Sequence, residues 1–403
     1  MINIDKIRAD FKMLDIQEDG KSNLYFDSAC MSLRPNSVLE AMNDYYTKYN
    51  ACAGRSAHKL GDKVTKKIKE TRGLVAKFIN ANTEEEIIFT KNTTESINLL
   101  ANSFIFKKDD VVLLSDKEHN SNLIPWLLLR DRIGIKVNIF STKDDGDFDL
   151  EEFERMTKGI KLVCFAYTSN LDGTSVPAKD IIKISHKNNA LVFLDCAQTV
   201  SHRKIDVQDL DVDFLAFSGH KVLGPTGTGI FYGKYKLLEN LKPFIVGGNT
   251  VLYSTYTDYK FLPIPERFEA GLLDYAGIIG LGEAIKYISN LSFEEINSHE
   301  LMLNSYITEE LSKFPQIKII GSYDPKKRGS IINFYIENKD MHQIATMLDN
   351  MANIAIRSGQ HCVHSYFNNR NIKNGARISL SFYNTKEEVE KLVDNLKKIM
   401  KII

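Results

Sequence analysis

The sequence lacks the features that mark membrane, secreted and nucleic-acid-binding proteins. No apolar run approaches the ~18 residues that a membrane-spanning helix needs. The start, MINIDKIRADFKML, is charged and amphipathic, unlike a secretion signal. The 403 residues carry 52 basic and 52 acidic side chains, so the zero net charge provides no basic excess for nucleic acid. We therefore expect a cytoplasmic protein that binds neither membranes nor nucleic acid.

Cysteine is scarce as well. The five cysteines are scattered, with no CxxC pair, which indicates a reducing compartment. Cys164 and Cys196 lie in apolar, strand-like runs and are predicted to be small buried side chains.

One cysteine stands out by its neighbours. The stretch IRSGQHCVHSYF (356–367) places Cys362 between His361 and His364. The three side chains could be metal ligands, or Cys362 could be a nucleophile or an inert thiol. H-C-x-H alone does not supply a four-ligand zinc set with the usual spacing, so we expect no metal.

Short apolar runs rich in β-branched residues alternate with longer amphipathic stretches through the first two thirds of the chain. This alternation predicts an α/β fold with a mostly parallel sheet covered by helices. The predicted strands are 86–90, 111–115, 136–140, 162–167, 190–197 and 214–219.

The pattern changes near residue 285, which predicts more than one structural unit. We expect an N-terminal segment (1–20) that packs with the small domain, a large α/β domain (21–284) and a smaller C-terminal α+β domain (285–403). In the last of these, helices are predicted at 293–314 and 385–400 and strands at 330–336 and 376–382. The stretch 253–269, rich in Tyr, Thr and Pro, is predicted to be an excursion such as a hairpin.

Polar side chains follow most of the predicted strands. Ligands of open α/β sheets bind at the carboxyl ends of the strands, so these side chains are expected to meet at one edge. They are Thr93 and Thr94, His119, Asn170, Asp195 and Gln198, and His220 and Lys221.

These residue types match the needs of pyridoxal phosphate. Lys221 can form a Schiff base with the cofactor, and Asp195 can keep its ring nitrogen protonated. Thr93 and Thr94 open a predicted helix whose N-terminus suits a phosphate, and the ring of His119 can cover the cofactor. Each feature alone is also typical of a helix cap, a turn or a surface side chain, and it is their combination at one edge that favours a cofactor site.

The sequence resembles class V, fold-type I pyridoxal-phosphate enzymes along nearly its whole length, and specifically cysteine desulfurases of the SUF type (group II). The most specific stretches are FSGHKVLGPTGTGI (217–230) for the class and RSGQHC (357–362) for the desulfurase branch. Further similar stretches are LYFDSA (24–29), EHNSNLIPW (118–126) and ARISLSFYNTKEEV (376–389).

The resemblance implies a role for each residue of the site. Lys221 carries the cofactor, Arg377 clamps the substrate carboxylate and Cys362 is the nucleophile. Together with His119, these three residues form the implied catalytic set. The implied cofactor-binding residues are Thr93, Thr94, His119, Asn170, Asp195, Gln198, Ser218, His220 and Lys221, and the implied substrate-binding residues are Asn170, Arg357 and Arg377.

The implied reaction converts L-cysteine into L-alanine and leaves the sulfur on Cys362 as a persulfide for an acceptor protein. The resemblance also implies a homodimer. Leu272 follows RFEAG where relatives usually have a threonine that reaches the phosphate of the other subunit, so one phosphate donor is expected to be missing.

Three other functions stay open. A selenocysteine lyase would use the same residues, whereas an aminotransferase or epimerase of the same class would leave Cys362 without a role. A degenerate pyridoxal-phosphate protein kept as a binding partner would not need the intact Lys221, Asp195 and Arg377. The pathway that receives the sulfur, iron–sulfur cluster assembly or another, and the roles of His361 and His364 also stay open.

Overall fold

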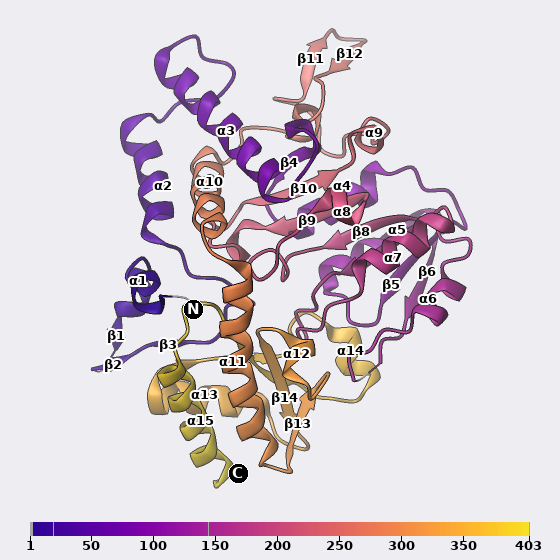
Figure 1. Cartoon of the computed structure of the whole chain (residues 1–403). Helices are drawn as coiled ribbons and strands as arrows, with labels where there is room; N and C mark the ends of the chain where they lie inside the picture. The colour runs from indigo at the N-terminus through magenta and orange to yellow at the C-terminus, as the bar shows by residue number, and fades with distance from the viewer. Residues whose placement is uncertain (1–2, 19, 144, 403) are drawn as a thin grey trace.

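The computed structural model describes residues 3–18, 20–143 and 145–402. Its main sheet has seven strands in the order β4-β10-β9-β8-β7-β5-β6, shown in the upper half of Figure 1. Strands β5 to β9 pair in parallel, whereas β10 is antiparallel to both of its neighbours. The strands are β4 (Ile87–Thr90), β5 (Val111–Ser115), β6 (Lys136–Phe140), β7 (Leu162–Ala166), β8 (Leu191–Asp195), β9 (Phe214–Ser218) and β10 (Gly229–Gly233).

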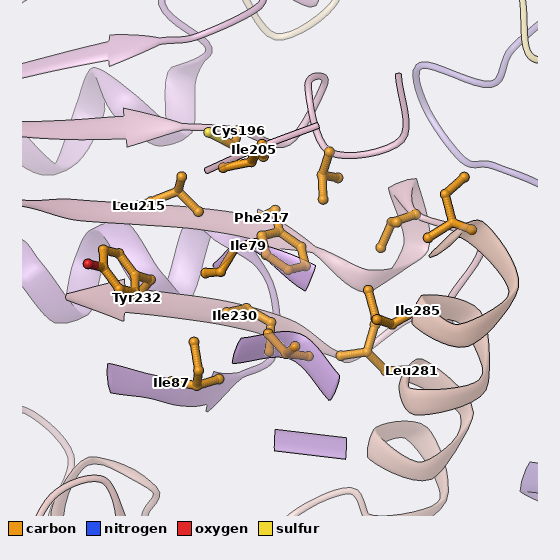
Figure 2. Close-up of a cluster of buried hydrophobic side chains, with 14 of the residues drawn as sticks. Ile79, Ile87, Cys196, Ile205, Leu215, Phe217, Ile230, Tyr232, Leu281 and Ile285 are labelled. Atoms are coloured by element: carbon orange, nitrogen blue, oxygen red, sulfur yellow. The ribbon is translucent and has the colours of Figure 1, made fainter. Parts of the chain in front are cut away.

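Helices cover both faces of this sheet. Along β9, Leu215 and Phe217 enter one hydrophobic cluster, and Phe214 and Ala216 enter another on the opposite face. Such burial on both faces explains why the central strands read as continuous apolar runs. Figure 2 shows the first cluster, in which side chains of the strands lie close to Leu281 and Ile285 of α10 (Tyr275–Ser289).

The helices of the two faces come from different parts of the chain. The first face is covered by α2 (Asn36–Lys48), α3 (Lys59–Phe78), α7 (Ala178–Lys187) and α10 (Tyr275–Ser289), and the second by α4 (Thr93–Ser103) and α5 (Ile124–Ile133). The shorter helices are α1 (Ile4–Arg8), α6 (Leu150–Met156), α8 (Val207–Leu210), α9 (Tyr235–Leu238), α12 (Pro325–Arg328) and α14 (His364–Asn369).

A second, four-stranded antiparallel sheet lies in the lower half of Figure 1. Its strands are, in order, β13 (Ile317–Ile320), β14 (Ile331–Ile336), β17 (Gly375–Ser379) and β16 (Arg357–Gly359). Helices α11 (Phe293–Ser312), α13 (Met341–Ala352) and α15 (Lys386–Met400) pack with it into a separate cluster. Thr385 and Glu388 form a capping box at the start of α15, which fixes where this closing helix begins.

The chain passes from the large to the small part through α10 and α11. The expected boundary at residue 284 falls within α10, whose Ile285 and Ile288 still belong to the large cluster. Strand β3 (Leu24–Tyr25) pairs in parallel with β15 (Ile354–Ala355), and Leu24 and Phe26 belong to the small cluster, although the large domain was expected from residue 21.

The N-terminal segment contacts both parts. Arg8 forms an ion pair with Glu388 (2.8 Å) and donates to the carbonyl of Tyr383 (2.6 Å). The ring of Phe11 contacts those of Tyr287 and Tyr383 at centroid distances of 5.8 and 5.2 Å. Residues 1, 2 and 19 of the expected segment, and residue 403 of the expected C-terminal domain, lie outside the described residues.

Most predicted elements of the core agree with the structure to within one or two residues. The expected hairpin is shorter than its stretch: β11 (Val251–Ser254) and β12 (Tyr259–Phe261) form it, and a turn follows. The short strand pair β1 (Gln17–Glu18) and β2 (Lys21–Ser22) was not predicted. Strand β10 was not predicted either, because it follows a glycine-rich stretch. In the described part of the chain, no helix is both long and apolar enough to cross a membrane.

Candidate active site

A cavity of about 230 Å³ lies where the carboxyl ends of the main-sheet strands meet the small domain. Strands β8 and β9 deliver Asp195 and Ser218 to it, and the small domain delivers Arg357 and Arg377. Every residue that the sequence predicts for the site lines this cavity: Thr93, Thr94, His119, Asn170, Asp195, Gln198, Ser218, His220, Lys221, Arg357, Cys362 and Arg377.

Asp195 and Lys221 face a dry environment that disfavours the charge of both. Burial raises the pKa of Asp195 above its ordinary value, against a backbone hydrogen bond from Ala197 (2.9 Å) and the charge of Lys221. Burial likewise lowers the pKa of Lys221, while the charge of Asp195 acts in the opposite direction. A lysine whose ammonium form is disfavoured is a better nucleophile and base, so Lys221 suits covalent chemistry.

Hydroxyl groups from three segments gather at the N-terminus of α4. Thr93 donates its backbone N–H to Ser218 Oγ (2.9 Å), and the hydroxyls of the two residues lie 2.8 Å apart. The hydroxyl of Thr94 lies 2.7 Å from that of Ser121. With the positive end of the helix dipole behind them, these donors suit a phosphate group.

The ring of His119 is fixed in one tautomer. Its Nδ1 accepts a hydrogen bond from the backbone N–H of Ser121 (3.0 Å), which leaves the proton on Nε2. Burial, followed by the charge of Lys221, lowers the pKa of His119 to about 3, so the ring is neutral near pH 7. A neutral, fixed imidazole suits stacking on a flat ligand.

Two strands of the small sheet, β16 and β17, each present an arginine to the cavity. Ala376 and Ile378 of β17 point into the small core, so Arg377 between them points the other way. Arg357 of β16 and Asn333 of β14 are its direct cross-strand partners, which places all three side chains on one face.

Arg377 is held in place with one donor to spare. It is 2% exposed and donates from Nη1 to the carbonyl of Asn170 (2.9 Å) and from Nη2 to Asp27 Oδ1 (3.2 Å). Its Nε is buried without a hydrogen-bond partner among the described residues. A buried guanidinium with an unused N–H on a cavity wall suits a carboxylate ligand.

The loop that carries Cys362 has an unusual backbone. His361 and Cys362 both have positive φ, 50° and 60°, a region that residues with a side chain rarely adopt. Two hydrogen bonds from the large domain hold the loop: Asn170 Nδ2 donates to the carbonyl of His361, and the backbone N–H of Asn120 donates to that of Cys362, each at 2.7 Å. The half-buried thiol of Cys362 thus lies on the cavity wall in a strained loop, and contacts with the large domain hold the loop in this conformation.

The two histidines beside Cys362 differ. His364 is exposed and its Nδ1 lies 2.7 Å from Asn120 Nδ2. His361 is 4% exposed, its ring nitrogens have no hydrogen-bond partner among the described residues, and burial lowers its pKa well below the ordinary value. Across residues 3–18, 20–143 and 145–402, no group of three His, Cys, Asp or Glu side chains is placed to hold a metal ion.

Sequence reasoning missed several residues that line the cavity. Ser121 and Thr168 belong to loops after strands that had been recognised, so the rule for strand ends could have found them. Cys30 follows no strand of the main sheet, and no signal pointed to it. The Nη1 of Arg357 lies 2.6 Å from the Sγ of Cys30.

Comparison with known proteins now identifies the family. The model of the aminotransferase class-V family matches residues 24–392. The chain belongs to this family, which confirms the predicted α/β fold of the fold-type I enzymes. Within it, a probable cysteine desulfurase of Borreliella burgdorferi is 40% identical over 99% of this chain and 97% of its own length.

Other full-length relatives carry the same name. A probable cysteine desulfurase of Streptomyces coelicolor is 37% identical over 99% of this chain and 97% of its own length. The apo structure of the cysteine desulfurase of Thermococcus onnurineus matches with a TM-score of 0.95 and 35% identity, covering 100% of this chain and 99% of that one. The resemblance to cysteine desulfurases is therefore confirmed.

Proposed function

We propose that this chain is a pyridoxal-phosphate-dependent cysteine desulfurase that converts L-cysteine into L-alanine and keeps the sulfur on Cys362. The observation that carries the proposal is the placing of Cys362, Lys221 and Arg377 on the walls of one cavity. The reaction needs a nucleophilic thiol, an amine that acts as a base and a group that binds the substrate carboxylate.

The residues of the cavity fit pyridoxal phosphate. Lys221 has the lowered pKa of a Schiff-base lysine, and Asp195 lies where it could hold a proton on a ring nitrogen. Thr93, Thr94 and Ser218 form the hydroxyl cluster at the N-terminus of α4 that suits the phosphate. When bound, the cofactor supplies an electron sink for the bonds at the substrate Cα.

The chain's own residues position the substrate and move its proton and sulfur. Arg377 binds the substrate carboxylate, using the Nε that has no protein partner. The amine of Lys221 takes the proton from the substrate Cα. The thiolate of Cys362 attacks the substrate sulfur, and a new S–S bond leaves this sulfur on Cys362 as a persulfide. The electron pair of the broken C–S bond stays with the substrate Cβ, which takes up a proton, so that the substrate becomes alanine.

The proposal includes two protein partners and a cytoplasmic setting. A persulfide has to be collected, so an acceptor protein or a reductant completes the cycle. A homodimer is supported by exposed apolar side chains between the segment that leads into the hairpin and the loop before α10. They are Phe244, Ile245, Val246, Leu252 and Leu272. The free thiols of all five cysteines agree with a reducing compartment.

The proposal is tested by measuring alanine and sulfide from L-cysteine with the cofactor-loaded protein, with and without a thiol reductant. We expect equal amounts of both products with the reductant, and protein-bound sulfur on Cys362 without it. Cys362→Ala should bind cysteine and change the cofactor's absorbance, yet form no persulfide. Cys52→Ala removes another partly exposed thiol outside the cavity and should behave as wild type. Full activity in Cys362→Ala would refute the proposal.

A further inference from the structure

A second thiol lines the cavity that Cys362 lines. Cys30 follows the β3 segment near the N-terminus and is half-buried, like Cys362. Arg357 holds its sulfur directly, with Nη1 2.6 Å from Sγ. Cys164 and Cys196, in contrast, are fully buried in the core on either side of the main sheet.

Contacts link Cys30 to the loop of Cys362 in a few steps. Arg357, which contacts Cys30, is the cross-strand neighbour of Arg377. Arg377 donates to the carbonyl of Asn170, and the side chain of Asn170 donates to the carbonyl of His361, the residue before Cys362. The two thiols therefore line the same cavity and are connected by this series of contacts.

The surroundings of Cys30 suit a reactive sulfur. Reactive cysteines occur in partly exposed and electropositive places. Two arginines and Lys221 line the same cavity, and the carboxylate of Asp27 interacts with Cys30 and can accept its proton. The ring of His361 adds an independent sign of a ligand, because it is almost fully buried at the cavity wall and neither ring nitrogen has a partner in the described part of the chain. An unpaired buried polar group of this kind indicates that something else binds there.

We propose that Cys30 is a second sulfur-carrying residue, which takes the sulfur over from Cys362; this inference rests on the proposed desulfurase function. The Cys30 thiolate attacks the outer sulfur of the Cys362 persulfide. The S–S bond to Cys362 breaks, Cys362 leaves as a thiolate, and a new S–S bond forms on Cys30. The exchange needs no oxidant or reductant. Arg357 stabilises the anionic end of the new persulfide, and Cys362 is free for another substrate before an acceptor arrives.

The test maps sulfur on each cysteine with time. The cofactor-loaded wild-type protein receives excess L-cysteine without reductant, is quenched with an alkylating reagent, and is digested for mass spectrometry. We expect added sulfur first on the peptide with Cys362 and later also on the peptide with Cys30. Cys30→Ala should lower the sulfur bound per subunit by about half, because one of two carriers is lost. Cys52→Ala is the matched control and should leave the load unchanged.

Each other outcome overturns a defined part of the argument. Sulfur on Cys362 alone, with wild-type load in Cys30→Ala, would overturn the transfer while the desulfurase function stands. Equal sulfur on Cys30 and Cys52 would show unspecific exchange, and sulfur on Cys30 in Cys362→Ala would show that Cys30 is not loaded through Cys362. A disulfide between Cys30 and Cys362 would show attack on the inner sulfur instead. No sulfur on Cys362 would refute the proposed function itself.

Discussion

Replacing Arg377 should weaken the contact with the substrate's carboxylate and leave the other contacts of the substrate unchanged. The side chain is 2% exposed, and its Nε has no protein partner, so water cannot readily replace the lost contact. Hydrogen bonds to a charged group contribute ~1.5–3 kcal/mol, so we expect the Kd of an amino-acid ligand to rise by about 10- to 150-fold in Arg377→Ala. Arg377→Lys keeps a charge beside Asp27 but loses the planar fork, and should recover only part of the affinity.

The measurement pairs two ligands with the variants. L-Alanine, the unreactive product, and L-alaninamide, which lacks the carboxylate, are titrated into the cofactor-loaded protein while its visible absorbance is followed. Wild type should bind alanine more tightly than the amide by the same factor that Arg377→Ala costs, and Arg377→Ala should hardly distinguish the two. Arg130→Ala, at an exposed site on α5, controls for the loss of any arginine. If Arg377→Ala still discriminated against the amide, the carboxylate would be bound elsewhere, and Arg357 would be the first candidate.

Three further variants test the cofactor site and the core. Lys221→Ala should lose the visible absorbance that borohydride abolishes in wild type, because no amine remains to hold the cofactor covalently; retention of that absorbance would exclude Lys221 as its link. Burial raises the pKa of Glu118 to about 7 from its ordinary 4.5, so folding stability should fall by about 3 kcal/mol as pH rises between these values, and denaturant titrations of Glu118→Gln should show no such slope. Glu269→Ala should cost ~3–5 kcal/mol of stability, because it leaves the charge of Arg72 buried and unpaired. Replacing both partners by Leu should restore part of this stability. Equal losses in the single and double variants would argue against a penalty from the unpaired charge.

The sequence was most informative where a single structural rule connects the local residue pattern of a strand with the position of the site. Buried parallel strands give continuous apolar runs, and the residue after such a run lies at a known edge of the sheet. Asp195 at the end of β8, Lys221 after β9 and Asn170 after β7 could therefore be placed together without any knowledge of contacts. Their roles came from chemistry and resemblance, because geometry alone does not distinguish a Schiff-base lysine from a buried ion pair.

The residues that sequence reasoning missed are placed by contacts between distant segments. Cys30 reaches the cavity, and Asp27 reaches Arg377, because β3 pairs with β15 of the small domain, about 330 residues further along the chain. No periodic pattern in a two-residue strand predicts such a pairing. Strand β10 was missed for a local reason, because glycines begin and end it and hide its apolar centre.

The substrate end of the site depends on both domains at once. The positive φ angles of His361 and Cys362 each cost of the order of 1–3 kcal/mol, and a hydrogen bond contributes only ~0.5–1.5 kcal/mol. The bonds from Asn120 and Asn170 together contribute ~1–3 kcal/mol against a cost of ~2–6 kcal/mol, so at central values they offset only half of the strain, and the packing of the small domain on the large sheet supplies the rest. Asp195, by contrast, ends β8, and Lys221 lies in the turn directly after β9, the neighbouring strand of the same sheet. The site thus combines a cofactor end fixed by one domain with a sulfur-handling end whose geometry exists only when the two domains are docked.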